Sequence, residues 1–270
     1  MPHSSTFAAM SNRETLLCIH GSAATGRSWS TIAAVLGARF DVAMPDRLGC
    51  GRDGGWRAGA PASFEAEARH LASWLCERPQ GAHVLAHSYG AAIAIELALR
   101  WPHRVRSLTL YEPARFALLF DESEPVAERD EILRTGGLVS LWVKSGRPGD
   151  AARMFVNYWS GPGAWDALDE RRQRGVCAGM PKVAAEFEAA FADRAPLHAF
   201  ERLTMPVRLM AGEDSPAPTR RIARTLARLM PAADLVELAG VGHMGPLTHP
   251  HAVIDNLPAW LATAERRVAA

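Results

Sequence analysis

The sequence predicts an α/β protein, with a mostly parallel sheet flanked by helices and an inserted helical cap. Short, nearly continuous apolar runs alternate with longer segments of helical spacing. This alternation is typical of parallel strands that are buried on both faces and joined by crossover helices. It stops near residue 113 and resumes near residue 204, which indicates one core interrupted by an insertion.

The first part of the chain predicts four strands with three helices between them. The strands are expected at 15–21, 40–46, 82–88 and 105–113, and the helices at 27–40, 63–78 and 89–101. Each strand is a short apolar run that ends at glycine, proline or a polar residue. The helix at 63–78 has a clear start, because Ser63 precedes two glutamates in the first turn.

The middle of the chain shows helical patterns and no convincing strand. Helices are expected at 130–146, 149–161 and 181–195, separated by Gly/Pro breaks. Strands return at 205–212 and 233–240, each followed by a helix, at 219–230 and 251–267. We therefore predict a core made of residues 1–113 and 204–270, with a helical cap at 114–203 inserted after the strand that ends at Glu112.

Composition excludes several classes of function. The 30 Lys and Arg residues nearly balance the 29 Asp and Glu residues, which argues against nucleic acid or an anionic membrane as a partner. No run approaches the roughly 18 apolar residues of a membrane span. The four cysteines are scattered without metal-ligand spacing, so we expect neither metal nor cofactor. No signal-peptide pattern is visible, and we expect a cytoplasmic protein; the oligomeric state stays open.

Ser88 lies where an apolar run meets a helical one, in the sequence Ala86–His87–Ser88–Tyr89–Gly90. A nucleophile on a sharp strand-to-helix turn needs tiny residues two positions before and after it, and Ala86 and Gly90 meet that need. The alternative is an ordinary helix cap. Serine also needs a base, and His243 follows it in a glycine-bounded loop after the last predicted strand.

Four stretches together resemble the α/β-hydrolase fold superfamily: LLCIHGSAATGRSW, VLAHSYGA, VRLMAGEDSPAP and GVGHMGPLTHP. The resemblance covers the core and not the insertion. It implies that Ser88 is the nucleophile and His243 the base, and that the backbone N–H groups of Ser22 and Tyr89 form the oxyanion hole. The chain departs from the family at its start, where we expect no full antiparallel strand pair before residue 15.

The acid that completes the triad is ambiguous in the sequence. The family commonly carries Gly-x-x-Asp after the strand that follows the cap, but here Ser215 stands at the expected place and Asp214 comes one residue early. Some members take the acid from the strand before the cap, where this chain has Glu112. We favour Glu112 and keep Asp214 as the alternative.

The predicted function is that of a serine hydrolase that cleaves a small or medium apolar ester, or a related carbonyl compound, through an acyl-enzyme. Hydrolysis of a carbon–carbon bond in a diketone-like substrate is an alternative, and a ligand-binding receptor or sensor on the same fold is an alternative of another class. A small molecule is the expected partner in each case. The expected pocket residues are Phe116, Leu118, Leu119, Trp142 and Trp159.

Overall fold

The computed structural model describes residues 13–76, 78–120, 127–257 and 259–262. Within them, six parallel strands form one sheet in the order β2–β1–β3–β4–β5–β6. The strands are β1 (Thr15–Ile19), β2 (Asp41–Ala43), β3 (Ala82–His87), β4 (Val105–Tyr111), β5 (Val207–Gly212) and β6 (Ala233–Leu238). The predicted fold class is confirmed. The expected lack of a strand pair before residue 15 concerns residues that lie mostly outside the described ones.

The sheet reverses its winding direction between β1 and β3. The chain passes from β1 outward to the edge strand β2 and then crosses back to β3 on the other side of β1. In an open parallel sheet, ligands bind beyond the carboxyl ends of the strands at such a point. The register places Ile19 beside Ala86 and Ala86 beside Leu110, so the loops after β1, β3 and β4 leave the sheet close together.

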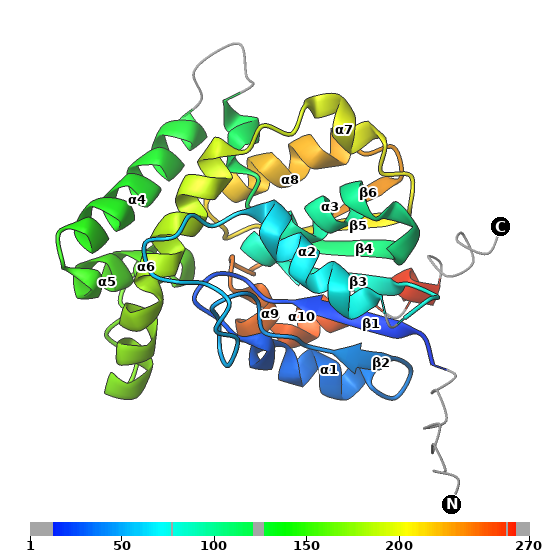
Figure 1. Ribbon diagram of the computed structural model, residues 1–270, viewed down its shortest axis with the longest axis horizontal. Helices are drawn as coiled ribbons and strands as arrows, with labels where there is room; N and C mark the ends of the chain where they lie inside the picture. Colours follow the sequence, from blue (N-terminus) through cyan, green and yellow to red (C-terminus); the bar gives the residue numbers. More distant parts are fainter. Residues whose placement is uncertain (1–12, 77, 121–126, 258, 263–270) are drawn as a thin grey trace, which may run out of the picture.

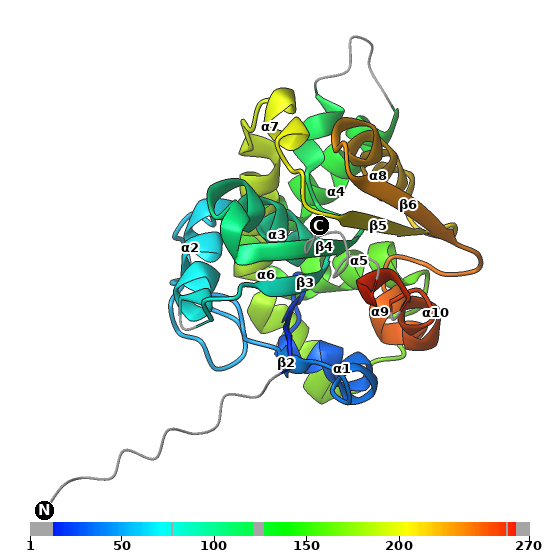
Figure 2. The same cartoon turned by 90° about the vertical axis from the view of Figure 1, so that its right-hand side faces the viewer.

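Helices cover both faces of the sheet (Figure 1, Figure 2). On β1, Leu17 and Ile19 contribute to one apolar cluster, whereas Leu16 and Cys18 contribute to the other. This alternation is why the strands read as continuous apolar runs. The first cluster includes side chains of α2 (Phe64–Leu75), α3 (Tyr89–Arg100) and α8 (Ala217–Leu229), together with the helices between β4 and β5. The second includes side chains of α1 (Ser30–Leu36) and α10 (Pro250–Ile254).

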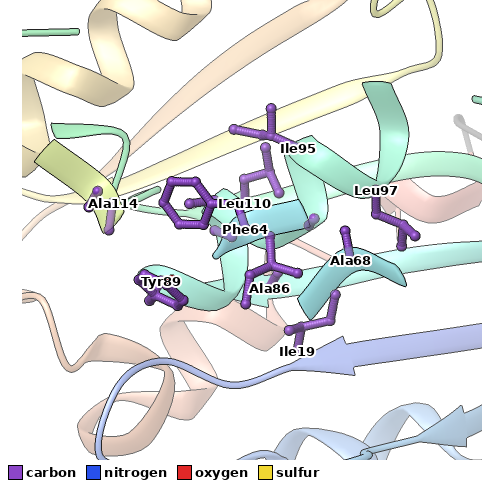
Figure 3. Close-up of a cluster of buried hydrophobic side chains, with 14 of the residues drawn as sticks. Ile19, Phe64, Ala68, Ala86, Tyr89, Ile95, Leu97, Leu110 and Ala114 are labelled. Atoms are coloured by element: carbon purple, nitrogen blue, oxygen red, sulfur yellow. The ribbon is translucent and has the colours of Figure 1, made fainter. Parts of the chain in front are cut away.

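Figure 3 shows the first cluster where it supports the start of α3. Ile19, Ala86 and Leu110, from three adjacent strands, lie in this cluster with Phe64 of α2 and Tyr89 of α3. All five side chains are at most 6% exposed. The strand-to-helix turn at Ser88 is therefore built on a close-packed base that resists displacement.

The described part of the segment between β4 and β5 contains helices and loops and no strand. It contains the short turn η3 (Phe116–Leu119) and the helices α4 (Ala127–Lys144), α5 (Pro148–Ser160), α6 (Glu170–Ala192) and α7 (Leu197–Glu201). Helices α4, α5 and α6 pack against one another and lie together at one end of the sheet (Figure 1). The division into a core and a cap domain at 114–203 stays a prediction.

Helix α6 is longer than the sequence predicted. A helix was expected to begin at Pro181, but α6 begins at Glu170, after Asp169, whose side chain accepts a hydrogen bond from the N–H of Arg172. Pro181 lies inside the helix. Proline usually ends a helix because it lacks an N–H donor. Here Met180 and Val183 on either side of it are buried in the core, and this packing offsets the lost hydrogen bond.

No helix in the described part of the chain is long and apolar enough to cross a membrane.

Candidate active site

Ser88 is held in a strained turn between β3 and α3. Its φ of 55° and ψ of −122° are rare for a residue with a side chain. Its N–H donates to the carbonyl of Tyr111, and its carbonyl accepts from the N–H of Ala114, so the strand β4 and its exit fix the turn. A Cβ at Gly90 would collide with the carbonyl oxygens of Ile19 and His20, which explains the glycine there.

His243 lies between Ser88 and Glu112 in a continuous hydrogen-bonded chain. Its Nε2 is 3.1 Å from the Oγ of Ser88, and its Nδ1 is 2.6 Å from Oε2 of Glu112. Because a carboxylate only accepts, Nδ1–H donates to Glu112 and Nε2 is left to accept from the serine hydroxyl. The side chains of His243 and Glu112 are 3% and 0% exposed. The structure thus brings together three residues that lie far apart in the sequence.

The carboxylate beside His243 belongs to Glu112 and not to Asp214. The second oxygen of Glu112, Oε1, accepts a hydrogen bond of 2.7 Å from the N–H of Gly212 at the end of β5. Glu112 has a φ of 46°, a second strained backbone at this site. Asp214 is exposed, and the buried Ser215 follows it. The backbone N–H of Asp214 donates to the carbonyl of Val241, in the loop that carries His243, but the residue is exposed and Glu112 occupies the position beside Nδ1.

Two further histidines are buried near the site and remain neutral. His87 donates from Nε2 to the carbonyl of His243 over 2.9 Å, which supports the loop that carries the histidine. Burial and the neighbouring His243 hold the pKa of His87 well below its usual value. Burial and the Arg47 guanidinium lower the pKa of His20 to about 3. Burial disfavours the charged form of an imidazole, so neither ring adds a positive charge to the site.

A cavity of about 50 Å³ opens above Ser88. Of the predicted pocket residues, Phe116 and Trp159 line it, as do both predicted oxyanion-hole residues, Ser22 and Tyr89. Tyr89 is the first residue of α3, where helix N–H groups have no partner within the helix. The other residues that line the cavity beside Ser88 are Ala24, His87, Ala114, Phe155, Val183, Glu186, Phe187, His243, Met244 and Leu247.

Three predicted pocket residues do not line this cavity. Leu118 lines a separate groove next to Phe120, and Leu119 is buried in the core at 1% exposure. Residues 116–119 form a single tight turn, so only Phe116 faces the cavity and the others point elsewhere. Trp142, on α4, lines another groove beside Tyr158, and Ser88 is not among the residues that line it.

Trp159 of α5 packs directly on the ring of His243, with ring centroids 4.1 Å apart and planes inclined by 35°. The helical segment therefore contributes to the environment of the histidine as well as to the cavity wall.

Sequence reasoning missed Glu186, whose side chain is 2% exposed in the cavity wall. The spacing of apolar residues around Glu186 in the sequence already indicates that it lies on the buried face of a helix. Val183, Glu186, Phe187 and Ala190 occupy one face of α6, and a glutamate in an otherwise apolar stripe indicates a partner or a function.

Metal coordination is not indicated in the described part of the chain, where no three His, Cys, Asp or Glu side chains are grouped as ligands.

The comparisons with known proteins identify the family of this chain. Residues 16–256 match the model of the alpha/beta hydrolase family, and the chain belongs to that family. It is a hydrolase whose named relatives indicate ester hydrolysis. The chain is 38% identical to lipase LipV of Mycobacterium tuberculosis, over only 37% of either chain. It is 27% identical to a pimeloyl-[acyl-carrier protein] methyl ester esterase of Aromatoleum aromaticum, over 88% of this chain and 94% of the relative.

Among solved structures, a hydrolase from Oleispira antarctica superposes with a TM-score of 0.77. The alignment covers 94% of this chain and 91% of the other, at 18% sequence identity. At that identity the likeness concerns the fold alone.

Proposed function

We propose that this protein is a serine esterase that cleaves small or medium apolar carboxylic esters through an acyl-enzyme. The observation that carries the proposal is the hydrogen-bonded chain Ser88–His243–Glu112 at the floor of a mostly apolar cavity. The two named relatives described above, a lipase and a methyl ester esterase, support an ester as the substrate class.

In the proposed mechanism, Ser88 attacks the ester carbonyl while His243 takes the proton from its hydroxyl. Glu112 holds His243 in the tautomer with Nδ1 protonated and stabilises the imidazolium that forms. The N–H groups of Ser22 and Tyr89 stabilise the oxyanion. His243 then protonates the leaving alcohol, and water releases the acyl group by the same steps in reverse order.

The size of the cavity favours a compact acyl group or a movement of the wall on binding. About 50 Å³ holds only a few heavy atoms, and Phe155, Trp159 and Phe187 form the wall opposite Ser88. We propose that the small-molecule partner enters between these aromatic side chains and the loop that carries Met244.

Replacing Ser88 by alanine tests the proposal. We expect the S88A variant to lower kcat on p-nitrophenyl esters by about 10⁴-fold or more, because the nucleophile is lost while binding and the oxyanion hole remain. Ser215→Ala is the matched control, since the hydroxyl of this buried serine, in the turn after β5, has no hydrogen-bond partner among the described residues. S215A should keep near-normal rates.

Covalent labelling and substrate turnover distinguish the esterase from the carbon–carbon hydrolase and from the receptor. A fluorophosphonate adduct mapped to Ser88, together with turnover of esters of graded chain length, supports the esterase. Turnover of a diketone-like substrate and not of esters would support the carbon–carbon hydrolase. An S88A variant as active as the wild type, or specific binding without turnover of any substrate, would contradict the proposal; the second result would favour a receptor.

A further inference from the structure

Glu186 is a buried carboxylate in the wall of the cavity that contains Ser88 and His243. It belongs to a cluster of four buried charges, in which Arg47 and Lys182 face Glu67 and Glu186. Its Oε1 lies 2.9 Å from Nη2 of Arg47 and 3.6 Å from Nζ of Lys182. Both cations therefore lie within ion-pair distance of the Glu186 carboxylate.

Nη1 and Nη2 of Arg47 and Nζ of Lys182 nevertheless donate to other acceptors, and Nε of Arg47 has no hydrogen-bond partner among the described residues. Arg47 donates from Nη1 to Glu67 and from Nη2 to the carbonyl of Gly21. Lys182 donates to Glu67 and to the carbonyl of Leu48. Among the described residues, none donates a hydrogen bond of normal geometry to either oxygen of Glu186. A buried carboxylate with its charge balanced but its acceptors unused is costly, and a donor that approaches it gains that energy.

The hydroxyl of Tyr89 is a second buried group without a hydrogen bond among the described residues. Tyr89 is 2% exposed, also lines the cavity, and packs its ring against Phe64 and under the guanidinium of Arg47. Glu186 is the charged group with the largest effect on the Tyr89 hydroxyl, and it raises the pKa of that group further beyond the effect of burial. Both residues also contact the same guanidinium, because Nη2 of Arg47 is 2.9 Å from Oε1 of Glu186 and its Cζ is 5.0 Å from the centroid of the Tyr89 ring. The carboxylate and the phenol therefore belong to one corner of the cavity wall.

We propose that Glu186 and the hydroxyl of Tyr89 form a polar subsite that binds a hydroxyl group of the substrate. The substrate O–H donates to the carboxylate, and its oxygen accepts from the phenol. The inference rests on the proposed esterase function and narrows its substrate class to esters that carry a hydroxyl close to the scissile bond.

Charge decides between a hydroxyl and the other groups that such a subsite would meet. The four buried charges already sum to zero, so a substrate ammonium would bring an unbalanced charge into a buried site. A substrate carboxylate has no proton to donate to Glu186 and would be repelled by it. A hydroxyl group can donate to Glu186 and accept from Tyr89 without adding a net charge.

The test compares hydroxylated esters with matched plain esters in a pH-stat. The pairs are methyl 3-hydroxybutyrate with methyl butyrate, ethyl lactate with ethyl propionate, and ethylene glycol monobutyrate with propyl butyrate. We expect kcat/KM to be about tenfold or more higher for the hydroxylated member of at least one pair, as one good hydrogen bond to a charged group provides. Both members of a pair use the same triad, and the ratio of their alkaline hydrolysis rates corrects for the inductive effect of the hydroxyl, so the corrected ratio reports the subsite.

Two variants assign this ratio to the subsite. Tyr89→Phe removes only the hydroxyl, and Glu186→Met removes the carboxylate, and each should bring the ratio close to one. Phe155→Leu, in the apolar wall, is the control and should change the rates of both esters by the same factor. Since E186M also removes a partner of Arg47, its thermal unfolding is measured alongside, and Y89F serves as the test if E186M does not fold.

The outcomes separate the subsite from the esterase function. Ester hydrolysis that depends on Ser88 but shows no preference within any pair would overturn the subsite and leave the esterase in place. A preference that survives in Y89F and in a folded E186M would also overturn it. The absence of any ester hydrolysis and of fluorophosphonate labelling at Ser88 would overturn the esterase itself.

Discussion

Ser88 and Glu112 both have positive φ angles, of 55° and 46°, at the ends of neighbouring strands. Such conformations cost roughly 1–3 kcal/mol each and persist only when surrounding contacts enforce them. The N–H of Ser88 is fixed by Tyr111, and that of Glu112 is fixed by Met210. The strain aims both side chains at His243, so the backbone stores energy in order to preorganise the site.

The first prediction at this scale concerns Glu112. We expect Glu112→Gln to lower kcat by about 10³- to 10⁴-fold, because the amide can stabilise the wrong imidazole tautomer and cannot offset the charge of imidazolium. Asp214→Asn is the control, and its exposed side chain should leave kcat within about twofold of the wild type. Steady-state kinetics on a p-nitrophenyl ester measure both. A large loss in D214N with a small one in E112Q would show that Asp214 is the acid.

Helix α6 connects the inserted helices to the core through buried charge. Lys182 reaches Glu67 of α2 at 2.8 Å, and its side chain is 6% exposed. It also donates to the carbonyl of Leu48 in the loop after β2. On the neighbouring turn of α6, Glu186 pairs with Arg47. One face of one helix therefore holds the loop after β2, the helix α2 and the cavity wall in a fixed arrangement.

At the scale of this element, Lys182→Met is expected to lower the free energy of unfolding by about 3 kcal/mol, because it leaves buried carboxylates without one of their two cations. Urea unfolding followed by circular dichroism measures the loss. Lys144→Met is the matched control, since Lys144 pairs with Glu188 on the surface of the same group of helices, where both side chains are more than half exposed. Equal stability of K182M and K144M would contradict a role of the buried cluster in holding α6.

The molecule is built on one sheet that is packed on both faces, and the site lies at the carboxyl ends of its strands. Ser22, Ser88 and Glu112 follow β1, β3 and β4, and His243 follows β6 across the sheet. Two histidines near this edge are buried without charge, and this links the stability of the fold to pH.

The folded protein keeps His20 neutral down to a pKa of about 3, and the pKa of His87 is also lowered well below its usual value. In the unfolded chain each imidazole takes up a proton near pH 6.5. Between these values the unfolded state binds more protons, so the free energy of unfolding falls as pH falls. We expect each histidine to contribute up to about 1.4 kcal/mol per pH unit.

Urea unfolding at pH 7, 6 and 5 measures this dependence. His20→Asn should make the loss of stability between pH 6 and 5 shallower, because one proton-binding difference is removed. A slope in H20N identical to that of the wild type would show that His20 is not the group responsible.

The sequence by itself determined the alternation of strands and helices and the tight strand-to-helix turn at Ser88. These features depend on local spacing. Apolar runs reveal buried strands, and Ala86 and Gly90 around Ser88 are required by the sterics of the turn itself. The family relationship could be predicted for the same reason, because its motifs are short and continuous in the sequence.

Only the tertiary structure decided which carboxylate accompanies His243. Glu112 and Asp214 both follow strands that adjoin one another in the sheet, so spacing alone could not separate them. The decision depends on backbone angles and on the N–H of Gly212, which is contributed from a distant segment. The same holds for the cavity wall, where Leu118, Leu119 and Trp142 point away and Glu186 points in.

The buried cluster of Arg47, Glu67, Lys182 and Glu186 illustrates the general reason. Its members come from three segments far apart in the chain, and each looks like an ordinary surface charge when read alone. A charge becomes a buried partner only when packing excludes water from around it. Local backbone geometry determines where the helices and strands form. The exclusion of water by segments that are distant in the sequence determines which charges are buried and what shape the site has.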